Sequence, residues 1–472
     1  MTPPTDTRAS GSASGAAPVA DKPHRPETPT LPPLPPPTVV SSASATADDC
    51  NCGLASAAEP LCPRDADTES LHSDVSDVSD LDKTGKLVAF LRDSGIPVVE
   101  SEINLHAKGH ALQTEVLNML VQLLPESWDH VKDPSELLLE RVSGAMTNCI
   151  YFVTGPTRPS STEATIGNGK RKILLRIYGS GAGQFISRDR EMFWLCKMSE
   201  SGVAPRLLGA FHNGRFEEFL DSTTLNKDDI RDPTTSAQIA VQLYKLHQLI
   251  HSSADADEVE STTTSDIWNK MRRWQKMAAK VVGDLKKNHP DRYAEMRKVI
   301  SIKGIKLEIE ELEEKLHAVE SPLVFAHNDA QYGNILRMRS DSSLMIVDYE
   351  YSSINYRAYD FANHFCEWAA DYHCATPHKM DFTRCPNRKE QDHFFNAYID
   401  AAGETDLSAE ERAARCAGMR RETHKFMLAS HMLWGLWGVM QAGETEIDFD
   451  YVGYACERFR QYWKMKDEVM AL

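Results

Sequence analysis

Three polar side chains, Asp329, Asn334 and Asp348, combine the types and the spacing that suit phosphoryl transfer. Asp329 follows the apolar run 323–326, Asn334 comes later on the same loop, and Asp348 follows another apolar run at 344–347. Phosphoryl transfer requires the protein mainly to position the reactants and to neutralise charge. An aspartate can orient an acceptor hydroxyl and accept its proton, while an asparagine and a second aspartate bind Mg²⁺ on the phosphates of ATP. We therefore predict Asp329 as the catalytic base, with Asn334 and Asp348 as magnesium ligands.

His327 is the first residue of the His-x-Asp motif that contains Asp329. We expect it to hold the loop by hydrogen bonds rather than to react. A His-x-Asp pair alone has little meaning, but the same pair followed by an asparagine and flanked by apolar runs is specific. The alternative interpretation of this segment is a coincidental polar hairpin.

A nucleotide site is expected upstream of this loop, in a segment rich in short apolar runs. Arg176 lies on the predicted strand 173–178, where a kinase carries its phosphate-binding lysine. Glu191 lies on the following predicted helix, where a partner carboxylate for Arg176 is expected. The alternative for this Arg–Glu pair is a surface salt bridge, which contributes little to stability.

Two further segments are expected to contact the nucleotide. Thr147 and Asn148 end the loop 143–148, which we expect to cover the phosphates; an ordinary turn is the alternative. Glu218 and Phe219 form the expected hinge against the adenine.

The hydrophobic pattern divides the chain into regions of different character. It predicts helices at 87–91, 112–124 and 188–199 and strands at 137–141, 149–154, 173–178, 204–211 and 215–220. After residue 237 the pattern is mostly helical, apart from short strands at 335–338 and 344–347. We predict an α+β, bilobal, protein-kinase-like fold, with a small β-rich N-terminal lobe and a larger, mainly helical C-terminal lobe. The expected regions are a disordered Pro/Ser/Thr-rich tail (1–82), a nucleotide-binding lobe (83–220) and a catalytic and substrate lobe (221–472).

Composition excludes several classes of partner. The formal net charge of −17 argues against nucleic acid and anionic membranes, which are themselves negatively charged. We expect no secretion signal and no stable membrane insertion, because the longest apolar stretch, 426–442, contains polar residues and glycines and is typical of a buried helix. The ten cysteines are consistent with reduced thiols, so we predict a cytoplasmic protein.

The tail carries two motifs of its own. The Ser-Asp repeat at 73–80 is consistent with a solvated acidic linker, and phosphorylation of its serines is the sharper hypothesis. The polyproline stretch at 31–37 leaves open a non-catalytic scaffold that docks a partner domain. A homodimer is a further hypothesis.

From about residue 130 to its end, the chain resembles the choline/ethanolamine kinase family. The similarity is densest in four blocks: 173–179, 325–336, 345–357 continuing through 363–368, and 428–437. The resemblance implies transfer of the ATP γ-phosphate to choline or ethanolamine, the first step towards phosphatidylcholine or phosphatidylethanolamine. ATP and Mg²⁺ are the implied cofactors, and the small amino alcohol is the implied partner.

The resemblance also implies an aromatic substrate pocket. A quaternary ammonium has no N–H to donate, so aromatic faces and carboxylates bind it. Trp434 and Trp437 are three residues apart on one predicted helix and therefore share a face, for which core packing is the alternative. The implied substrate-binding residues are Gln331, Glu367, Tyr372, Trp434, Trp437, Phe449 and Tyr454.

Choline is the favoured acceptor, because the loop 328–334 is similar to that of fungal choline kinases. The segments 447–454 and 464–466 are instead similar to ethanolamine kinases, so an ethanolamine kinase or a kinase with both activities is the alternative. Another small-molecule kinase, or a protein kinase, is a more remote alternative, because the substrates of those enzymes would not require the pair of tryptophans. The chain departs from relatives at 144–145, where Gly-Ala stands in place of two glycines.

Overall fold

The computed structural model describes residues 83–142, 148–158, 170–178, 188–251, 265–443 and 449–471. These residues all fall in the second of two units of the chain, Leu61–Leu472. The predictions for the tail 1–82 and for the loop 143–147 lie outside the described residues.

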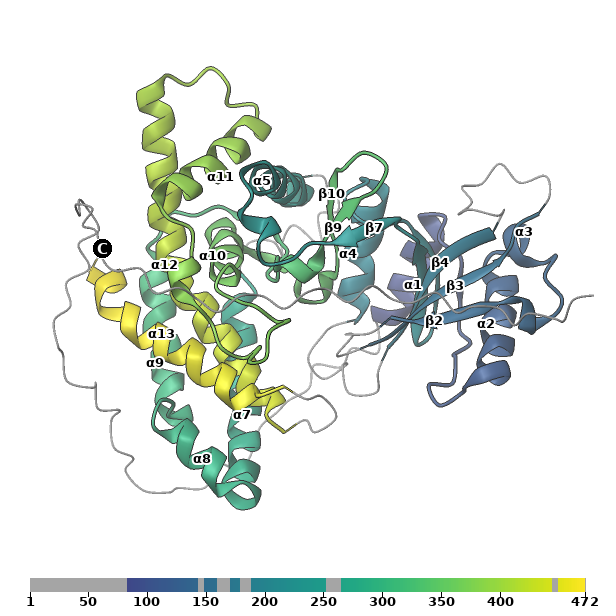
Figure 1. Ribbon diagram of the computed structural model, residues 1–472, viewed down its shortest axis with the longest axis horizontal. Helices are drawn as coiled ribbons and strands as arrows, with labels where there is room; N and C mark the ends of the chain where they lie inside the picture. The colour runs from purple at the N-terminus through teal and green to yellow at the C-terminus, as the bar shows by residue number, and fades with distance from the viewer. Residues whose placement is uncertain are drawn as a thin grey trace, which may run out of the picture. The chain divides into compact units, whose positions relative to one another are not determined.

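A six-stranded sheet forms the centre of the N-terminal lobe (Figure 1). Its strands in spatial order are β1 (Val98–Val99), β5 (Leu207–Phe211), β6 (Gly214–Glu218), β4 (Lys170–Tyr178), β3 (Asn148–Pro156) and β2 (Leu138–Arg141). Only β1 and β5 pair in parallel, and every other neighbouring pair is antiparallel. The predicted strands are confirmed to within a few residues, whereas β1, with two residues, is too short to give a hydrophobic period.

Among the described residues, four helices cover this sheet: α1 (Lys83–Asp93), α2 (Gly109–Leu123), α3 (Pro125–Trp128) and α4 (Arg188–Glu200). Helix α2 buries an apolar stripe that includes Val116 and Leu120, and this stripe packs with Leu175 of β4. Helix α4 contributes to a second apolar cluster, which also contains residues of the C-terminal lobe. There Trp194 stacks on Phe325, with ring centroids 4.1 Å apart. The strand that leads into the predicted catalytic loop is therefore packed against α4.

Helices make up most of the C-terminal lobe. They are α5 (Pro233–His247), α7 (Ile267–Asn288), α8 (Pro290–Arg297), α9 (Ile302–His317), α10 (Arg357–Glu367), α11 (Arg388–Ala401), α12 (Ala409–Gln441) and α13 (Tyr451–Ala471). Helix α12 begins after Ser408, which forms a capping box with Glu411. Residues 426–440 of this helix are all buried, which confirms the predicted buried helix at 426–442.

Two glycines on α12 allow α13 to approach closely. A Cβ atom at Gly435 would lie 2.6 Å from the ring of Phe459, and one at Gly438 would lie 3.0 Å from the ring of Tyr454. Real Cβ atoms essentially never approach other atoms as closely as 2.6 Å and rarely as closely as 3.0 Å, so a larger residue, above all at position 435, would push the helices apart. The glycines follow Trp434 and Trp437 directly, so they also fix these side chains relative to α13.

Two small antiparallel sheets carry the predicted catalytic segments. Strand β8 (Leu323–Ala326) pairs with β11 (Ser353–Tyr356). Strand β9 (Ile335–Met338) lies between β7 (Ser222–Thr224) and β10 (Leu344–Ile346). Short 3-10 helices occur at η2 (Pro134–Glu136), η4 (Asp229–Arg231), η5 (Gln248–His251), η6 (Tyr332–Asn334), η7 (Tyr349–Tyr351) and η8 (Phe382–Arg384).

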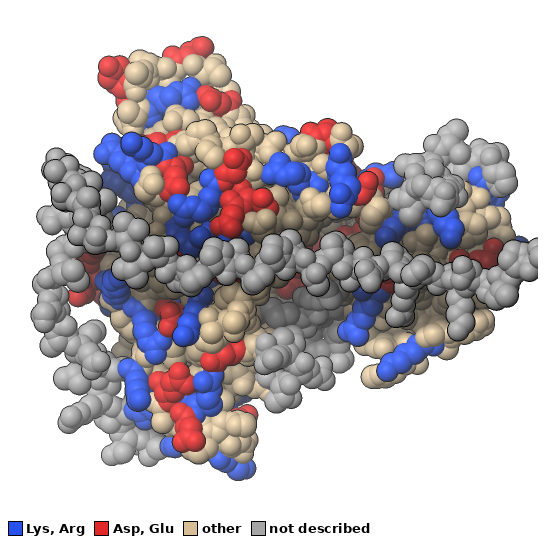
Figure 2. Space-filling view, viewed as in Figure 1, with Lys and Arg blue, Asp and Glu red and all other residues tan. Residues whose placement is uncertain are grey.

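The arrangement confirms the predicted α+β class, with a β-rich lobe followed by a mainly helical one. None of the helices in the described ranges is long and apolar enough to cross a bilayer. On the face seen in Figure 2, acidic and basic side chains are interspersed over the described residues rather than segregated by sign. A mixed surface of this kind gives no strong attraction to polyanions on that face.

Candidate active site

The predicted catalytic loop is held in shape by a buried aspartate, Asp360 on α10. Its two carboxylate oxygens accept the backbone N–H groups of His327 and Asn328, each at 2.8 Å. His247 on α5 also binds this carboxylate through Nε2 at 3.0 Å. Asn328 has a left-handed backbone with φ of 66°, which is unfavourable for a residue other than glycine. The anchor to α10 therefore maintains a turn that the chain would not favour by itself.

His327 supports the same loop from inside. Its ring is fully buried, and burial lowers its pKa, so the imidazole is neutral near pH 7. Nδ1 accepts the backbone N–H of Asp329 at 3.2 Å, which leaves Nε2–H to donate to the carbonyl of Val347 at 3.1 Å. These are the contacts of a supporting side chain, because both ring nitrogens are bound to backbone.

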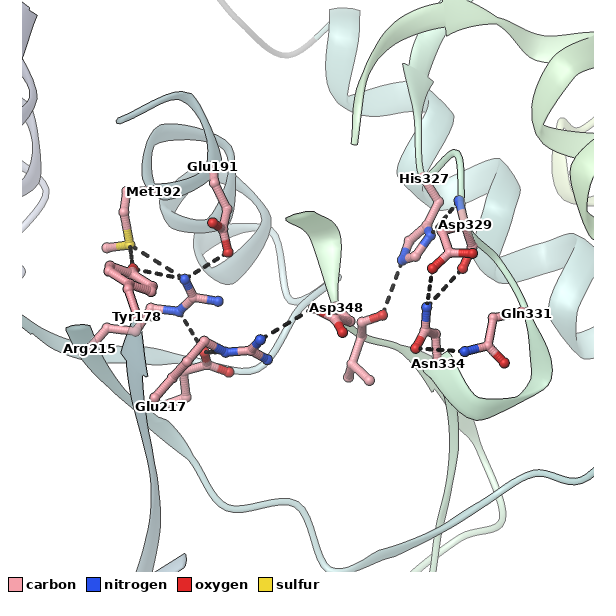
Figure 3. Close-up of polar contacts among 12 residues, drawn as sticks. Tyr178, Glu191, Met192, Arg215, Glu217, His327, Asp329, Gln331, Asn334 and Asp348 are labelled. Atoms are coloured by element: carbon pink, nitrogen blue, oxygen red, sulfur yellow. Dashed lines mark hydrogen bonds and ion pairs between the residues drawn. The ribbon is translucent and has the colours of Figure 1, made fainter. Parts of the chain in front are cut away.

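Asp329 and Asn334 are in direct contact (Figure 3). The Asn334 amide nitrogen donates to Asp329 Oδ2 and to the Asp329 carbonyl, each at 2.9 Å. Gln331 donates to Asn334 Oδ1 at 3.2 Å. The pKa of Asp329 is raised well above its usual range by burial and by the nearby charges of Glu367, Asp348 and Glu350. The loop thus presents a carboxylate with unusually high proton affinity.

Asp348 follows β10 and has a left-handed backbone with φ of 69°. The N–H of Val347 donates to the Asn334 carbonyl at 2.8 Å, which brings the two predicted magnesium ligands close together. Asp348 accepts a hydrogen bond from Arg176 Nη1 at 3.3 Å. In Figure 3, Asp348 lies between the catalytic-loop residues and a group of charged side chains from the N-terminal lobe.

The predicted Arg176–Glu191 pair is corrected by the structure. Glu191 binds Arg215 of β6, at 2.8 Å, whereas the ion pairs of Arg176 among the described residues are with Asp348 and Glu217. Strand β6 lies beside β4 and places Arg215 directly opposite Arg176. Arg215, rather than Arg176, is therefore the arginine that pairs with Glu191 on α4. All four charged side chains of this N-terminal-lobe group are buried, so a surface salt bridge is also excluded.

The other predicted nucleotide residues lie at or just beyond the ends of two interior strands, β6 and β3. Glu218 ends β6 and pairs with Arg206 at 3.2 Å. Phe219 lies in the short connection to β7, with its ring edge-on to Phe152 at 5.3 Å between centroids. Asn148 begins β3 and pairs with Tyr178 in the backbone ladder, and its side chain, like the whole of Thr147, lies outside the described residues.

An aromatic cluster surrounds the tryptophan pair of α12. The rings of Trp434 and Trp437 are 5.6 Å apart and lie edge-on to each other. Tyr351 lies 5.3 Å from Trp434 and accepts the indole N–H of Trp437 at 3.0 Å. Tyr454 lies 5.9 Å from Trp437 and 5.8 Å from Phe449. The predicted aromatic residues of α12 and α13 are therefore brought together, with Tyr351 as an additional member.

Glu367 joins this cluster through two polar contacts. Its Oε2 accepts the hydroxyl of Tyr372 at 2.7 Å, and its Oε1 forms a buried ion pair with Arg458 of α13. Arg458 also donates to the hydroxyl of Tyr454 at 3.0 Å. Glu367, Tyr372 and Tyr454 thus belong to one network, and Arg458 compensates the charge of its carboxylate.

The aromatic cluster is connected to the catalytic loop. Asn328, next to Asp329, donates its side-chain amide to the carbonyl of Tyr351 at 3.0 Å. The charge of Glu367 contributes to the raised pKa of Asp329, and the charge of Asp329 contributes to that of Tyr351. The cluster and the Asp329 carboxylate are thus linked through Asn328 and lie within electrostatic range of each other.

Sequence reasoning missed four residues of this arrangement: Asp360, Tyr351, Arg215 and Arg458. A signal existed for Arg458, because it lies one helical turn after Tyr454 among residues of an apolar face. Tyr351 lies within a block that was already singled out for its resemblance. The roles of Asp360 and Arg215 depend on contacts between distant segments and have no local pattern.

Comparison with known proteins places these features in a family. The family model described as choline/ethanolamine kinase matches residues 139–463. A protein described as probable choline kinase 2 of Arabidopsis thaliana is 36% identical over 371 residues, which cover 79% of this chain and 97% of the relative. The choline/ethanolamine kinase of Homo sapiens is 34% identical over 359 residues, covering 74% and 85%.

A solved structure supports the fold. The ethanolamine kinase of Plasmodium vivax gives a TM-score of 0.61 at 24% identity and covers 84% of this chain and 99% of its own. This likeness confirms the predicted bilobal, protein-kinase-like architecture. The family match also confirms an ATP-dependent phosphotransferase with a small alcohol as acceptor, in preference to a non-catalytic scaffold. The chain belongs to the choline/ethanolamine kinase family.

Proposed function

We propose that this enzyme transfers the γ-phosphate of Mg²⁺-ATP to the hydroxyl of choline, giving phosphocholine and ADP for phospholipid synthesis. The observation that carries the proposal is the aromatic cluster of Trp434, Trp437 and Tyr351, joined to the catalytic loop through Asn328. A quaternary ammonium is recognised by aromatic faces, and Tyr351 of the cluster accepts a hydrogen bond from Asn328, the residue next to the proposed base Asp329.

In this proposal Asp329 is the general base. It orients the choline hydroxyl and accepts its proton as the oxygen attacks the γ-phosphorus. The raised pKa of Asp329 supports this role, because a carboxylate with higher proton affinity is a better proton acceptor near neutral pH. Gln331, which contacts Asn334, is placed to help align the acceptor.

Asn334 and Asp348 are the proposed magnesium ligands. Their donor set fits the ion, because Mg²⁺ takes one or two oxygen ligands from protein and completes its shell with phosphate oxygens and water. When bound there, Mg²⁺ would neutralise charge on the transferring phosphate. Arg176, which contacts Asp348, is proposed to bind the phosphates, with Thr147 and Asn148 in the same subsite. Glu218 and Phe219 are the proposed adenine hinge.

The contacts of Glu367 favour choline over ethanolamine. One of its oxygens accepts from Tyr372 and the other is paired with Arg458. A primary ammonium would have to share these oxygens with Tyr372 and Arg458 to satisfy its N–H groups, whereas a trimethylammonium needs only apolar and π surface. Ethanolamine, as sole or second acceptor, is the alternative, because the matching family model covers both activities.

Steady-state kinetics with a series of acceptors tests this proposal. Ethanolamine, its mono- and dimethyl derivatives and choline are compared at saturating Mg²⁺-ATP, with 3,3-dimethylbutanol as the uncharged shape control. We expect kcat/KM to rise with each methyl group, by about tenfold or more in total, and to be lowest for the uncharged control. A preference for ethanolamine would overturn the choice of acceptor. Failure to phosphorylate any of the amines would overturn the proposed activity.

We also propose the division into residues 83–220 and 221–472 as nucleotide and substrate lobes, and a cytoplasmic location. The connection between β6 and β7, at the point where the chain leaves the large sheet, supports that boundary. Homodimerisation and phosphorylation of the Ser-Asp repeat are further proposals for this chain. Removal of residues 1–80 is expected to leave turnover intact, and a loss of activity would show that the tail contributes to catalysis.

A further inference from the structure

Two arginines face each other across neighbouring strands of the N-terminal lobe. Arg176 of β4 and Arg215 of β6 occupy directly opposed positions in the antiparallel ladder. Their exposed fractions are only 6% and 3%. Like charges at directly opposed positions are destabilising, and burial makes the repulsion stronger. The pair therefore requires compensation by buried carboxylates.

Glu191 and Glu217 supply this compensation, and both carboxylates lie closer to Arg215 than to Arg176. Arg215 donates to Glu191 Oε1 at 2.8 Å and to Glu217 Oε1 at 2.6 Å, and it also donates to the hydroxyl of Tyr178. Arg176 Nε lies 3.5 Å from the same oxygen of Glu217. Burial alone would raise the pKa of Glu217, but Arg215 and Arg176 hold it below its ordinary value. Both carboxylates therefore contact Arg215 more closely than they contact Arg176.

The remaining donors of Arg176 face in a different direction. Its Nη1 lies 3.3 Å from Asp348, a proposed magnesium ligand on the other lobe. The contact of this guanidinium with Glu217 is made by Nε. Arg176 is thus held loosely from behind and directed towards the place where the phosphates are proposed to bind.

We propose that Arg215 is a positioning residue for nucleotide binding, which binds Glu191 and Glu217 so that Arg176 stays directed at the phosphates. If Arg215 were absent, Glu191 would lose its 2.8 Å contact, compete for Arg176 and draw its guanidinium away from Asp348, whereas Glu217 already contacts Arg176 at Nε. The inference rests on the proposed role of Arg176 in the nucleotide site. In this inference the contact between Arg215 and Glu191 does not bind the nucleotide. It keeps Glu191 away from Arg176, the arginine proposed to bind the phosphates.

Two double variants with the same formal charge test this inference. Arg215→Gln alone is expected to raise KM for Mg²⁺-ATP, and the dissociation constant of Mg²⁺-ADP measured by calorimetry, by about tenfold, with KM for choline unchanged. Adding Glu191→Gln removes the competing carboxylate and is expected to restore both values to within about threefold of wild type. Adding Glu217→Gln instead removes the group behind Arg176 and is expected to restore neither.

Equal behaviour of the two double variants would overturn the inference, because only net charge would then matter. An equal rise in the KM values for both substrates with Arg215→Gln would also overturn it, because that pattern indicates a general structural role. If Arg215→Gln folds poorly, Arg215→Lys replaces it, because lysine keeps the charge but lacks the forked donors that bind two carboxylates at once. A selective rise in KM for Mg²⁺-ATP in that variant supports the inference, and an unchanged KM for Mg²⁺-ATP contradicts it. Calorimetry with Mg²⁺-ADP needs no acceptor, so it tests the inference even if wild-type enzyme proves to use another alcohol.

Discussion

Replacing Asp360 by asparagine should loosen the catalytic loop without removing any group that reacts. The carboxylate accepts three hydrogen bonds, from the backbone N–H groups of His327 and Asn328 and from His247. Burial alone would raise the pKa of Asp360, but these donors lower it below the ordinary value, so the charged form is favoured in the folded protein. An asparagine can keep an oxygen for two of the donors, but its amide nitrogen must face the third.

The expected cost follows from that lost contact. A hydrogen bond to a charged group contributes about 1.5–3 kcal/mol, so Asp360→Asn should lower the free energy of unfolding by about 2–3 kcal/mol. The left-handed conformation of Asn328 is only mildly strained, because asparagine adopts it more readily than most residues, and it would be free to relax. Displacement of a catalytic group by about 1 Å can reduce turnover about a hundredfold, so we expect kcat to fall by about 10- to 100-fold.

Urea denaturation and steady-state kinetics measure the two effects. Asp381→Asn is the matched control, because Asp381 caps the short helix η8 from an exposed position. The control should lose about 1 kcal/mol or less and keep its kcat. The reasoning is refuted if Asp360→Asn denatures at the same urea concentration as the control and turns over like wild type.

Three other outcomes are expected. Asp329→Asn should reduce turnover by about 10²- to 10⁴-fold while binding of Mg²⁺-ADP is retained. The same variant should denature at a higher urea concentration, because the raised pKa of Asp329 means that folding disfavours its ionised carboxylate. Retained turnover would exclude Asp329 as the base. Trp437→Leu should raise KM for choline by about 3- to 30-fold and leave KM for ATP unchanged, with Trp437→Phe close to wild type, whereas equal effects of the two variants would argue for packing alone. His364, which binds the Ala330 carbonyl and the indole of Trp368, has its pKa lowered by burial to about 4. The folded state therefore binds fewer protons than the unfolded state, and stability should decline as pH falls from about 6.5 towards 4, by about 2 kcal/mol between pH 7.5 and 5 from this group; a His364→Gln variant with the same pH dependence as wild type would contradict this assignment.

The sequence by itself identified the catalytic loop because its signal is local. Asp329, Asn334 and Asp348 lie at the ends of short apolar runs, and such runs form the strands β8, β9 and β10 almost where the pattern places them. Helix periodicity likewise placed Trp434 and Trp437 on one face of α12. A spacing of three residues on a helix, or one residue beyond a strand, fixes geometry without knowledge of the rest of the molecule.

Tertiary structure decided which groups meet across long separations. The expected partner of Arg176 was Glu191, but the pairing of β4 with β6 put Arg215 between them. The Glu367 carboxylate is compensated by Arg458 of α13, and the catalytic loop is anchored by Asp360 of α10. Buried charges take whichever opposite charge the packing of strands and helices brings within reach, and no local period of the sequence encodes that distance.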